Sequence, residues 1–457
     1  MTSSRDAAEA CFHDGNACLQ AGDPDAAEVA FREALRLAEG FAEAHANLGL
    51  SLERLGRPAE AESHYRTALR LDPGQARTQV NLGVLLAAQK RFVDAEAAYL
   101  QAILRDPGLV SAWSNLGVLH ACLKREAEAE QCYRTALSLD EKHVSARFNL
   151  AYILLRQGRF DEGWACLEAR DWYGALAARL PCPRWQGEAL EGKSLIISVE
   201  AGHGDMIQFC RYAALLKGQG AGFITLICHP SLKRLFRTLA AVDQVVGLDE
   251  ALPEARYDFW SPALSLPFHC GTREDNIPAS IPYLAATPEA VARRAAELPR
   301  GGLRVGLVWR GNPAFENDAD RSLPGLEALA PLWRVGGVHF VSLQKGVGEQ
   351  EAADPPAGQP LLDLGPSLSD FADTAAAVAN LDLVIAVDTA VAHLAGAMGK
   401  PCWLLLPWFR TDWRWLDACS RTPWYPSMCL YRQPAMGDWD SVVADVAQAL
   451  EALVTGR

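Results

Sequence analysis

The chain has 457 residues, of which 50% are hydrophobic and 22% charged; this balance excludes an intrinsically disordered protein, and the length suggests about three domains. Its formal net charge of −13 repels polyanions, so we expect no nucleic acid among its partners. No apolar run reaches the roughly 18 residues of a spanning helix, and the polar N-terminus lacks a signal core, so we expect a cytoplasmic protein without an integral membrane segment.

A 34-residue repeat fills the N-terminal third of the sequence. The tripeptide Asn-Leu-Gly begins at Asn47, Asn81 and Asn115, and Asn-Leu-Ala begins at Asn149. Each of the three glycines is followed after 12 positions by an alanine and after 16 positions by a tyrosine. Over about residues 8–170 this pattern resembles the tetratricopeptide repeat, a pair of amphipathic helices. The resemblance predicts that residues 1–170 form an α-solenoid, whose stacked units share a core and leave a concave groove.

The recurring asparagines are candidate ligands for an extended peptide. In tetratricopeptide arrays this position looks into the groove, and a side-chain amide offers a donor and an acceptor together. Asn47, Asn81, Asn115 and Asn149 would then bind a protein partner with little demand on its sequence. Alternatively, the four amides bond between helices within the array, and the sequence leaves both interpretations open.

A phosphate-loop motif stands in an unsuitable context between the two halves. We expect residues 171–193 to form a linker, because the helical period breaks there and prolines stiffen the passage. Residues 187–194 match the pattern GxxxxGK[ST], but a true phosphate loop follows a buried strand and opens a helix. Here the predicted strand comes after the motif, so we predict a turn and no ATP site.

Short apolar runs alternate with amphipathic segments from residue 194 onward, which is typical of parallel sheets covered by helices. The pattern restarts near residue 300, so we expect two doubly wound domains, over 194–298 and 299–457, that bind ligands outside the carboxyl ends of their strands. A helix over 440–453 closes the chain. The predicted strands are 195–200, 223–228, 245–248, 304–309, 338–343, 361–364, 381–387 and 402–406.

Polar loops at the predicted strand ends carry a second resemblance. Residues 204–209 and 388–396, supported by the runs at 342–346, 413–416 and 424–426, are similar to glycosyltransferase family nine. The similarity is to the heptosyltransferase-like bacterial branch that is fused to tetratricopeptide repeats. It implies an α/β GT-B fold, with two facing Rossmann-like domains, the first on the acceptor side and the second on the nucleotide-sugar side. It also implies inversion at the anomeric carbon, with the nucleotide sugar as co-substrate and no cofactor.

This resemblance assigns roles to individual residues. Asp205 would be the general base that deprotonates the acceptor hydroxyl. Asp388 would bond hydroxyls of the donor sugar, and the helix that opens at Thr389 would bind the diphosphate through its first amides. Arg321 and Lys345 would stabilise the leaving nucleoside diphosphate. The remaining donor-binding candidates are Asn312, Gln344 and His393.

The first loop departs from the family pattern. The branch usually carries glutamate-glutamine-glycine-leucine-glycine-aspartate, whereas this chain has Glu200-Ala-Gly-His203-Gly-Asp205. His203 is therefore a second candidate for the base. Structural alternatives also stay open for the candidates: the aspartates suit helix caps, His393 suits a packed core, and the cations suit the surface.

Two further patterns have purely structural explanations beside the functional ones. Asp318-Ala-Asp320 resembles the DxD metal motif of other glycosyltransferases, but the two-Rossmann class handles leaving-group charge with helix dipoles and cations, so we expect no metal site. Trp413, Trp415 and Trp424 belong either to the core or to a sugar or base pocket.

Together these features predict a metal-independent, inverting glycosyltransferase that moves a sugar from a nucleotide sugar to a protein held by the repeats. A flagellin or another surface protein would be a natural acceptor in bacteria. One alternative is an envelope-glycan or lipopolysaccharide glycosyltransferase whose repeats serve assembly. Another is a non-catalytic repeat scaffold with an inactive transferase half.

Overall fold

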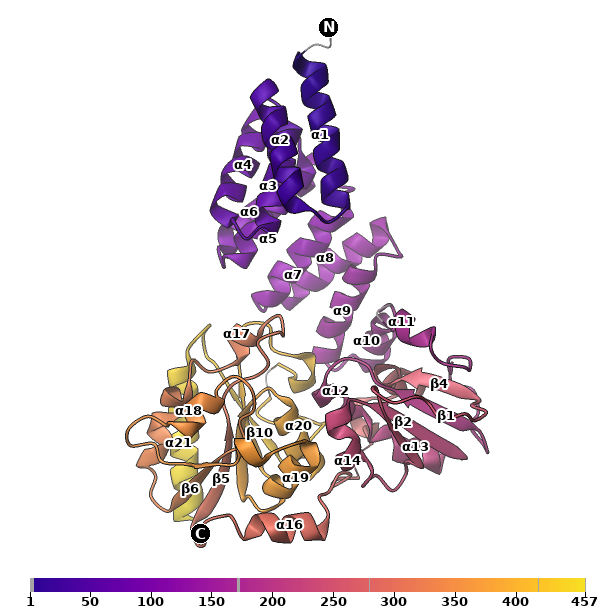
Figure 1. Cartoon of the computed structure of the whole chain (residues 1–457), viewed down its shortest axis with the longest axis vertical. Helices are drawn as coiled ribbons and strands as arrows, with labels where there is room; N and C mark the ends of the chain where they lie inside the picture. Colours follow the sequence, from indigo (N-terminus) through magenta and orange to yellow (C-terminus); the bar gives the residue numbers. More distant parts are fainter. Residues whose placement is uncertain (1–3, 171–172, 279, 418, 457) are drawn as a thin grey trace. The chain divides into compact units, whose positions relative to one another are not determined.

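The computed structural model describes residues 4–170, 173–278, 280–417 and 419–456 of the chain (Figure 1). The chain divides into two compact units, Met1–Ile153 and Leu154–Arg457. The first unit is helical, and the second combines parallel sheets with helices, as the sequence predicts. Within the described ranges, no helix is both long and apolar enough to cross a membrane.

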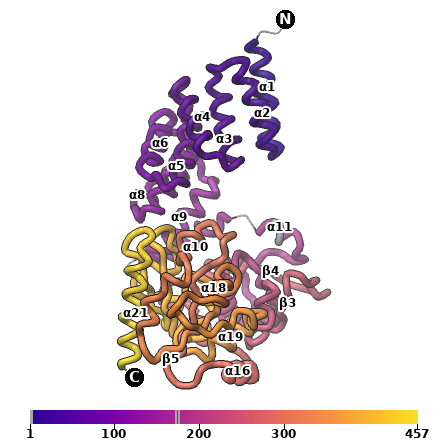
Figure 2. The backbone as a smooth tube through the Cα atoms, turned by 60° about the vertical axis from the view of Figure 1, so that its left-hand side comes forward, coloured from indigo at the N-terminus to yellow at the C-terminus, as the bar shows by residue number. Residues whose placement is uncertain are grey.

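Helices of the first unit follow one another as packed pairs joined by short turns (Figure 2). The pairs are α1 (Ser4–Gln20) with α2 (Pro24–Leu37), α3 (Ala42–Arg54) with α4 (Pro58–Leu71), α5 (Ala76–Ala88) with α6 (Phe92–Arg105), and α7 (Val110–Cys122) with α8 (Glu126–Leu139). Helix α9 (Val144–Arg156) crosses the division between the units. Contacts also join each pair to the next, so the helices form a solenoid.

A glycine in the first helix of each pair lets an aromatic ring of the second helix lie against its backbone. A Cβ at Gly49 would stand 2.7 Å from the ring of Tyr65, too close for any real contact. The equivalent glycine–ring pairs are Gly15 with Phe31, Gly83 with Tyr99, and Gly117 with Tyr133. These rings are at most 2% exposed. The glycine of Asn-Leu-Gly therefore recurs because a ring occupies the space of its missing side chain.

Arginines at the start of the second helices connect consecutive pairs. Arg57 reaches Glu28 of the preceding pair at 2.7 Å and bonds Glu60 of its own helix at the same distance. We call this series of ion pairs the arginine ladder. Its other members are Arg91 with Glu62 and Asp94, and Arg125 with Glu96 and Glu128. Because the arginine side chains are partly exposed, each pair contributes only about 0–1 kcal/mol.

The second unit starts with the end of α9, α10 (Phe160–Leu167) and α11 (Gly174–Ala177), and its first sheet has four parallel strands in the order β3-β2-β1-β4. The strands are β1 (Ser194–Ser198), β2 (Phe223–Cys228), β3 (Gln244–Gly247) and β4 (Phe259–Pro262). The accompanying helices are α12 (His203–Phe209), α13 (Tyr212–Gly218), α14 (Lys233–Phe236) and α15 (Leu266–His269).

The second sheet has six parallel strands in the order β10-β9-β8-β5-β6-β7. The strands are β5 (Leu303–Val308), β6 (Val338–Ser342), β7 (Leu362–Asp363), β8 (Leu383–Val387), β9 (Cys402–Leu406) and β10 (Met428–Arg432). The helices are α16 (Pro288–Ala295), α17 (Asp318–Arg321), α18 (Glu349–Ala353), α19 (Phe371–Ala379), α20 (Ala390–Ala397) and α21 (Trp439–Thr455), with a 3₁₀ helix at Leu326–Arg334.

Helices cover the second sheet on both faces, as an all-parallel sheet requires. Helix α21 packs Val442, Val446 and Leu450 into a core shared with β5 and β8. Helices α19 and α20 lie on the other side of the sheet (Figure 1). Counted along the chain, the strand order is 3-2-1-4-5-6, the order of the doubly wound nucleotide-binding fold.

The predicted strands agree with β1–β3 and β5–β9 to within two residues, but the sequence pattern misses β4 and β10. Strand β4 has four residues and ends in Pro262, and β10 is an edge strand that ends in Arg432. Both are too short or too polar at one end to show a buried run. Between β1 and β2 the chain forms two short helices, α12 and α13.

The phosphate-loop pattern at 187–194 forms a turn, as predicted. Gly192 has a φ of +66° and donates its N–H to the Gly220 carbonyl at 2.8 Å. Strand β1 begins at Ser194, directly after the motif, so no helix follows to present amides to a phosphate.

We predict that Gly49→Ala destabilises the repeats by about 1–3 kcal/mol, because the new methyl group overpacks against Tyr65. The sign is informative, since alanine normally stabilises a helix relative to glycine by about 1 kcal/mol. Gly40→Ala is the control: its Cβ would meet nothing within 4 Å, and we expect a change of at most about 0.5 kcal/mol. Urea unfolding followed by circular dichroism measures both; equal effects would contradict the packing argument.

Candidate functional site

In each sheet of the second unit the strand order reverses at one position, the switch point. In both sheets the first strand, β1 or β5, lies beside the fourth, β4 or β8, and ligands of doubly wound sheets bind outside the carboxyl ends at this switch point. Helix α12 follows β1, and α20 follows β8. The two helices pack so closely that a Cβ at Gly204 would stand 2.8 Å from the ring of His393. The two carboxyl edges therefore face a common region.

Asp205 lies at this contact and is held from two directions. Its Oδ2 accepts the N–H of Gly202 at 2.8 Å, and its Oδ1 pairs with the guanidinium of Arg414. Arg414 also bonds Gln208 and lies 3.1 Å from Asp412. Burial raises the pKa of Asp205, while the charge of Arg414 opposes that shift. The helix-capping interpretation is therefore correct, and about a fifth of the side chain stays exposed for other contacts.

Asp388 directly follows β8 and precedes the first turn of α20. Its Oδ2 accepts the indole N–H of Trp415 at 2.8 Å, and the helix N-cap is the next residue, Thr389. The capping role considered for Asp388 is therefore wrong. Burial, together with the negative charge of Asp412, raises the pKa of Asp388 to about 6.

Two other predicted residues lie on α20. His393 is buried, its Nδ1 is 2.9 Å from the hydroxyl of Tyr425, and burial holds its pKa well below the usual value, so the ring is neutral. His393 thus satisfies the packed-core alternative. The hydroxyl of Thr389 is buried and, among the described residues, has no hydrogen-bond partner.

Two arginines, Arg321 and Arg211, bring positive charge to the surroundings of His393. Arg321 pairs with Asp318 at 3.2 Å, stacks over Phe315, and lowers the pKa of both Asp388 and His393. Arg211 is 3% exposed and bonds the Trp424 carbonyl at 3.0 Å. The contacts described for Arg211 include rings, a hydroxyl and carbonyls but no carboxylate, so its charge stays uncompensated.

Asn312, Gln344 and Lys345 lie on neighbouring loops. Asn312 is exposed and accepts the N–H of Ala314 at 3.0 Å. Gln344 is 1% exposed, accepts the N–H groups of Trp309 and Arg310 at 3.1 Å, and donates to three carbonyls, so it ties the loops after β5 and β6 together. Lys345 donates to the Gly365 carbonyl at 3.0 Å, with half its side chain exposed. The hydrogen bonds described for these three residues join the loops after β5, β6 and β7, and none of them reaches Asp205 or Asp388.

His203 lies in a stack of rings. It packs against His229 at 4.2 Å and Phe371 at 5.4 Å, and its Nε2 is 2.8 Å from the Ser231 hydroxyl. Burial lowers the pKa of His203 to about 4, which makes the ring a weak base.

The DxD-like residues have partners of another kind. Asp318 accepts from Arg321 at 3.2 Å and from the Ser322 hydroxyl at 3.1 Å. Over the ranges that the structure describes, no three His, Cys, Asp or Glu side chains gather as metal ligands.

Sequence reasoning missed Arg414 and the position of Trp415. Arg414 pairs with a residue 209 positions earlier, so no local spacing could reveal it. Trp413, Trp415 and Trp424 are at most 1% exposed, and Trp413 and Trp424 pack edge-on against Trp164 of α10. The core interpretation of the tryptophans is therefore correct.

The four repeat asparagines recur at equivalent positions of α3, α5, α7 and α9, and all are half-buried. The amide of Asn47 donates to Asn16 at 2.6 Å, so this member bonds within the array. In the part of the chain that is described, the side chains of Asn81 and Asn115 have no such bond.

Comparisons with known proteins support the repeats. Models described as tetratricopeptide repeat match residues 12–76, 47–110, 110–143 and 132–165. Residues 12–165 are therefore tetratricopeptide repeats. A solved structure of Pseudomonas aeruginosa PilF is 27% identical, covers 36% of this chain and 77% of its own, and has a TM-score of 0.35. A thermophilic tetratricopeptide-repeat protein of Thermus thermophilus is 22% identical over 38% of this chain and 100% of its own, with a TM-score of 0.33.

One curated relative extends beyond the repeats. Protein FlbA of Caulobacter vibrioides (strain ATCC 19089 / CIP 103742 / CB 15) is 30% identical over 331 residues, which are 66% of this chain and 54% of that protein. The chain thus spans about half the length of this relative.

We predict that Asp388→Asn raises stability at pH 7.5 by about 1–3 kcal/mol. The folded-state pKa of about 6 lies above the unfolded value of about 3.9, so the native state binds more protons between these values and loses stability as pH rises through them. Asparagine removes this cost and still accepts from Trp415. The gain should vanish below about pH 4.

Melting temperatures at pH 4 and 7.5 measure this gain. Asp438→Asn is the control, because the helix-capping bonds of Asp438 lower its pKa and predict no gain at pH 7.5. A destabilised Asp388→Asn variant at pH 7.5 would show that the carboxylate is favoured in the fold.

Proposed function

We propose that the chain is an inverting glycosyltransferase of GT-B architecture that transfers a sugar from a nucleotide sugar to a protein held by its repeats. The observation that carries the proposal is the convergence of both switch points on one loop. Arg414 contacts Asp205 at the edge of the first sheet, and the adjacent Trp415 bonds Asp388 at the edge of the second. In the proposal the acceptor binds at the edge of the first sheet and the nucleotide sugar at the edge of the second, so that the sugar passes between them.

The donor side suits a diphosphate. The first amides of α20 point toward the carboxyl edge of its sheet, where the helix dipole favours negative charge. Arg321 adds positive potential at both Asp388 and His393, and the buried Arg211 adds it at His393. The unpartnered Thr389 hydroxyl is available as a donor. In the proposal these groups stabilise the leaving nucleoside diphosphate, without a metal ion, while Asp388 bonds the sugar hydroxyls.

The acceptor side supplies the base. Inversion in one displacement needs a single group to take the proton of the attacking hydroxyl. Asp205 is partly exposed, and burial makes its carboxylate more basic than an ordinary aspartate. In the proposal Arg414 holds Oδ1, and Oδ2, which also accepts the Gly202 N–H, receives the proton. Asp205 is preferred to His203 because the pKa of His203 is about 4 and its ring is stacked on both faces.

A panel of nucleotide sugars tests the donor assignment. Thermal shift should reveal at least one that raises the melting temperature, because ligands that bind only the native state stabilise it. Mass spectrometry of co-expressed proteins should then show the added mass of a sugar residue when the chain is present, and no addition when it is absent. Absence of both binding and hydrolysis for every nucleotide sugar would leave the repeat scaffold as the better hypothesis.

We predict that Asp205→Asn lowers the transfer rate by about two to four orders of magnitude with donor affinity retained, the usual effect of losing a general base. His203→Ala is the comparison, and a larger loss there would move the base to His203. Because the pKa of Asp205 is raised, wild-type kcat/KM should fall with decreasing pH at a higher pH than for an ordinary aspartate. A rate profile that is flat down to pH 4 would exclude Asp205 as the base.

The asparagines give a separate prediction about the acceptor. Replacing Asn81 and Asn115 by alanine should raise the KM of a protein acceptor roughly tenfold, since each lost hydrogen bond costs about 0.5–1.5 kcal/mol. Donor affinity should stay unchanged. Asn47→Ala is the matched control, because the amide of Asn47 is already bonded to Asn16 and its loss should mainly lower the melting temperature. A folded double variant with unchanged acceptor kinetics would favour a small or lipid-linked acceptor.

A further inference from the structure

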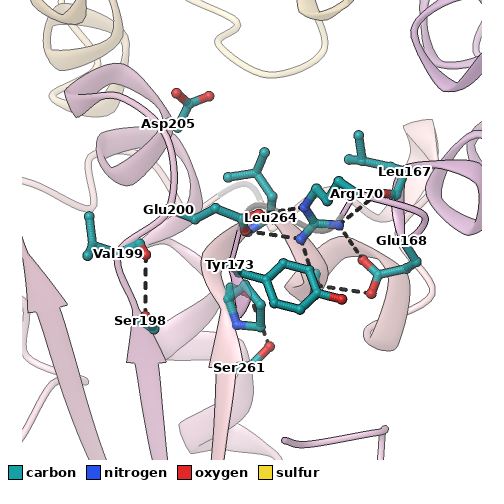
Figure 3. A network of polar contacts seen from close by, with 12 residues as sticks. Leu167, Glu168, Arg170, Tyr173, Ser198, Val199, Glu200, Asp205, Ser261 and Leu264 are labelled. Carbon is teal, nitrogen blue, oxygen red and sulfur yellow. Dashed lines mark hydrogen bonds and ion pairs between the residues drawn. The ribbon is translucent and has the colours of Figure 1, made fainter. Parts of the chain in front are cut away.

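A network of four charged side chains joins the segment after helix α10 to the loop that carries Asp205; Figure 3 labels three of them, Glu168, Arg170 and Glu200. Arg170 follows α10 and has a fully buried side chain. Its Nε and Nη2 lie 2.5 and 3.0 Å from the two carboxylate oxygens of Glu200, which is two residues beyond β1. Arg184 and Glu168 complete the network, and both bond Ser265.

Glu200 occupies the switch point of the first sheet. Its Oε2 also accepts the N–H of Leu264, which follows β4, so the carboxylate spans the gap between β1 and β4. Where a doubly wound sheet would leave a crevice for a ligand, this chain places the guanidinium of Arg170. The guanidinium therefore ties Glu200, at the start of the Asp205 loop, to the segment that follows α10.

The loop between Glu200 and Asp205 needs such fixing. Ala201 has a φ of +60°, a conformation that costs a non-glycine residue free energy and persists only where its surroundings determine it. Three contacts surround Ala201: Glu200 is clamped by Arg170, the Ala201 carbonyl lies 3.1 Å from His229 Nε2, and the Gly202 N–H bonds Asp205. Of these three contacts, the pair of Arg170 with Glu200 is the one made by a residue outside the first sheet and its loops.

Helix α10 belongs to the segment matched by the repeat models, which extends to residue 165. It is anchored by Trp164, whose indole donates to the Thr272 carbonyl at 2.9 Å and packs against Trp413. We infer that Arg170 is a positioning residue for sugar transfer: with Glu200 it fixes the loop of Asp205, and so makes the last repeat helix part of the transfer site. This inference rests on the proposed function.

The test is the double variant Arg170→Met/Glu200→Gln, which removes both charges together and leaves no unpaired buried ion. Arg170→Lys keeps the charge but cannot form the two-pronged contact. We expect the double variant to lower kcat about 10–100-fold, with donor KM changed less than twofold, and Arg170→Lys to fall between it and the wild type. Arg273→Met/Asp161→Asn is the matched control, an exposed ion pair 3.0 Å long that also joins α10 to the first sheet region, and should leave kcat unchanged.

Hydrogen exchange of residues 200–206, followed by mass spectrometry at a temperature where each variant is folded, gives a readout independent of activity. We expect at least tenfold faster exchange in the double variant and no change in the control. Unchanged exchange overturns the inference, and so does faster exchange with a wild-type kcat. A wild-type chain that transfers no sugar overturns the proposed function instead, while the exchange result still decides whether Arg170 fixes the loop.

Discussion

The pairing of Arg414 with Asp205 is the contact on which the proposed site depends. A carboxylate and a guanidinium that both leave water must compensate one another, and here they belong to different sheets. The pair is possible because Gly204 has no side chain and allows α12 to approach His393 of α20. Once these helices meet, Trp415 is placed to bond Asp388, and both switch points share one loop.

The same electrostatic requirement explains why charges of opposite sign are distributed as they are. Asp412 lies near both Arg414 and Asp388, which neutralises the first and makes the second more basic. Arg211 instead has aromatic faces and carbonyls around it, and its charge lowers the pKa of His393.

Local features of the sequence were sufficient for much of this architecture. The repeat period reports contacts within 16 residues, such as Gly49 with Tyr65, and the strands with buried runs were predicted nearly to their ends. Asp205 and Asp388 became candidates because the loops after two strand ends resemble glycosyltransferase family nine, and their roles stay predictions. Pairings across the chain were out of reach: Arg414 with Asp205 and Arg170 with Glu200 depend on how sheets and helices pack, which no spacing encodes. The edge strand β10 and the four-residue β4 were missed because their apolar signal is short.

The contacts of the arginine ladder repeat along the chain, whereas those of helix α10 occur once. Each arginine in the ladder bonds an acid 29 residues earlier and another three residues later, so a duplicated 34-residue unit would recreate all its own contacts. The addition or loss of one whole unit would therefore keep the ladder continuous. A copy of helix α10 would not recreate its contacts, because Trp164 and the neighbouring Arg170 bond partners that occur once in the chain. A change in the number of repeats would therefore leave the contacts of α10 within the second unit unaltered.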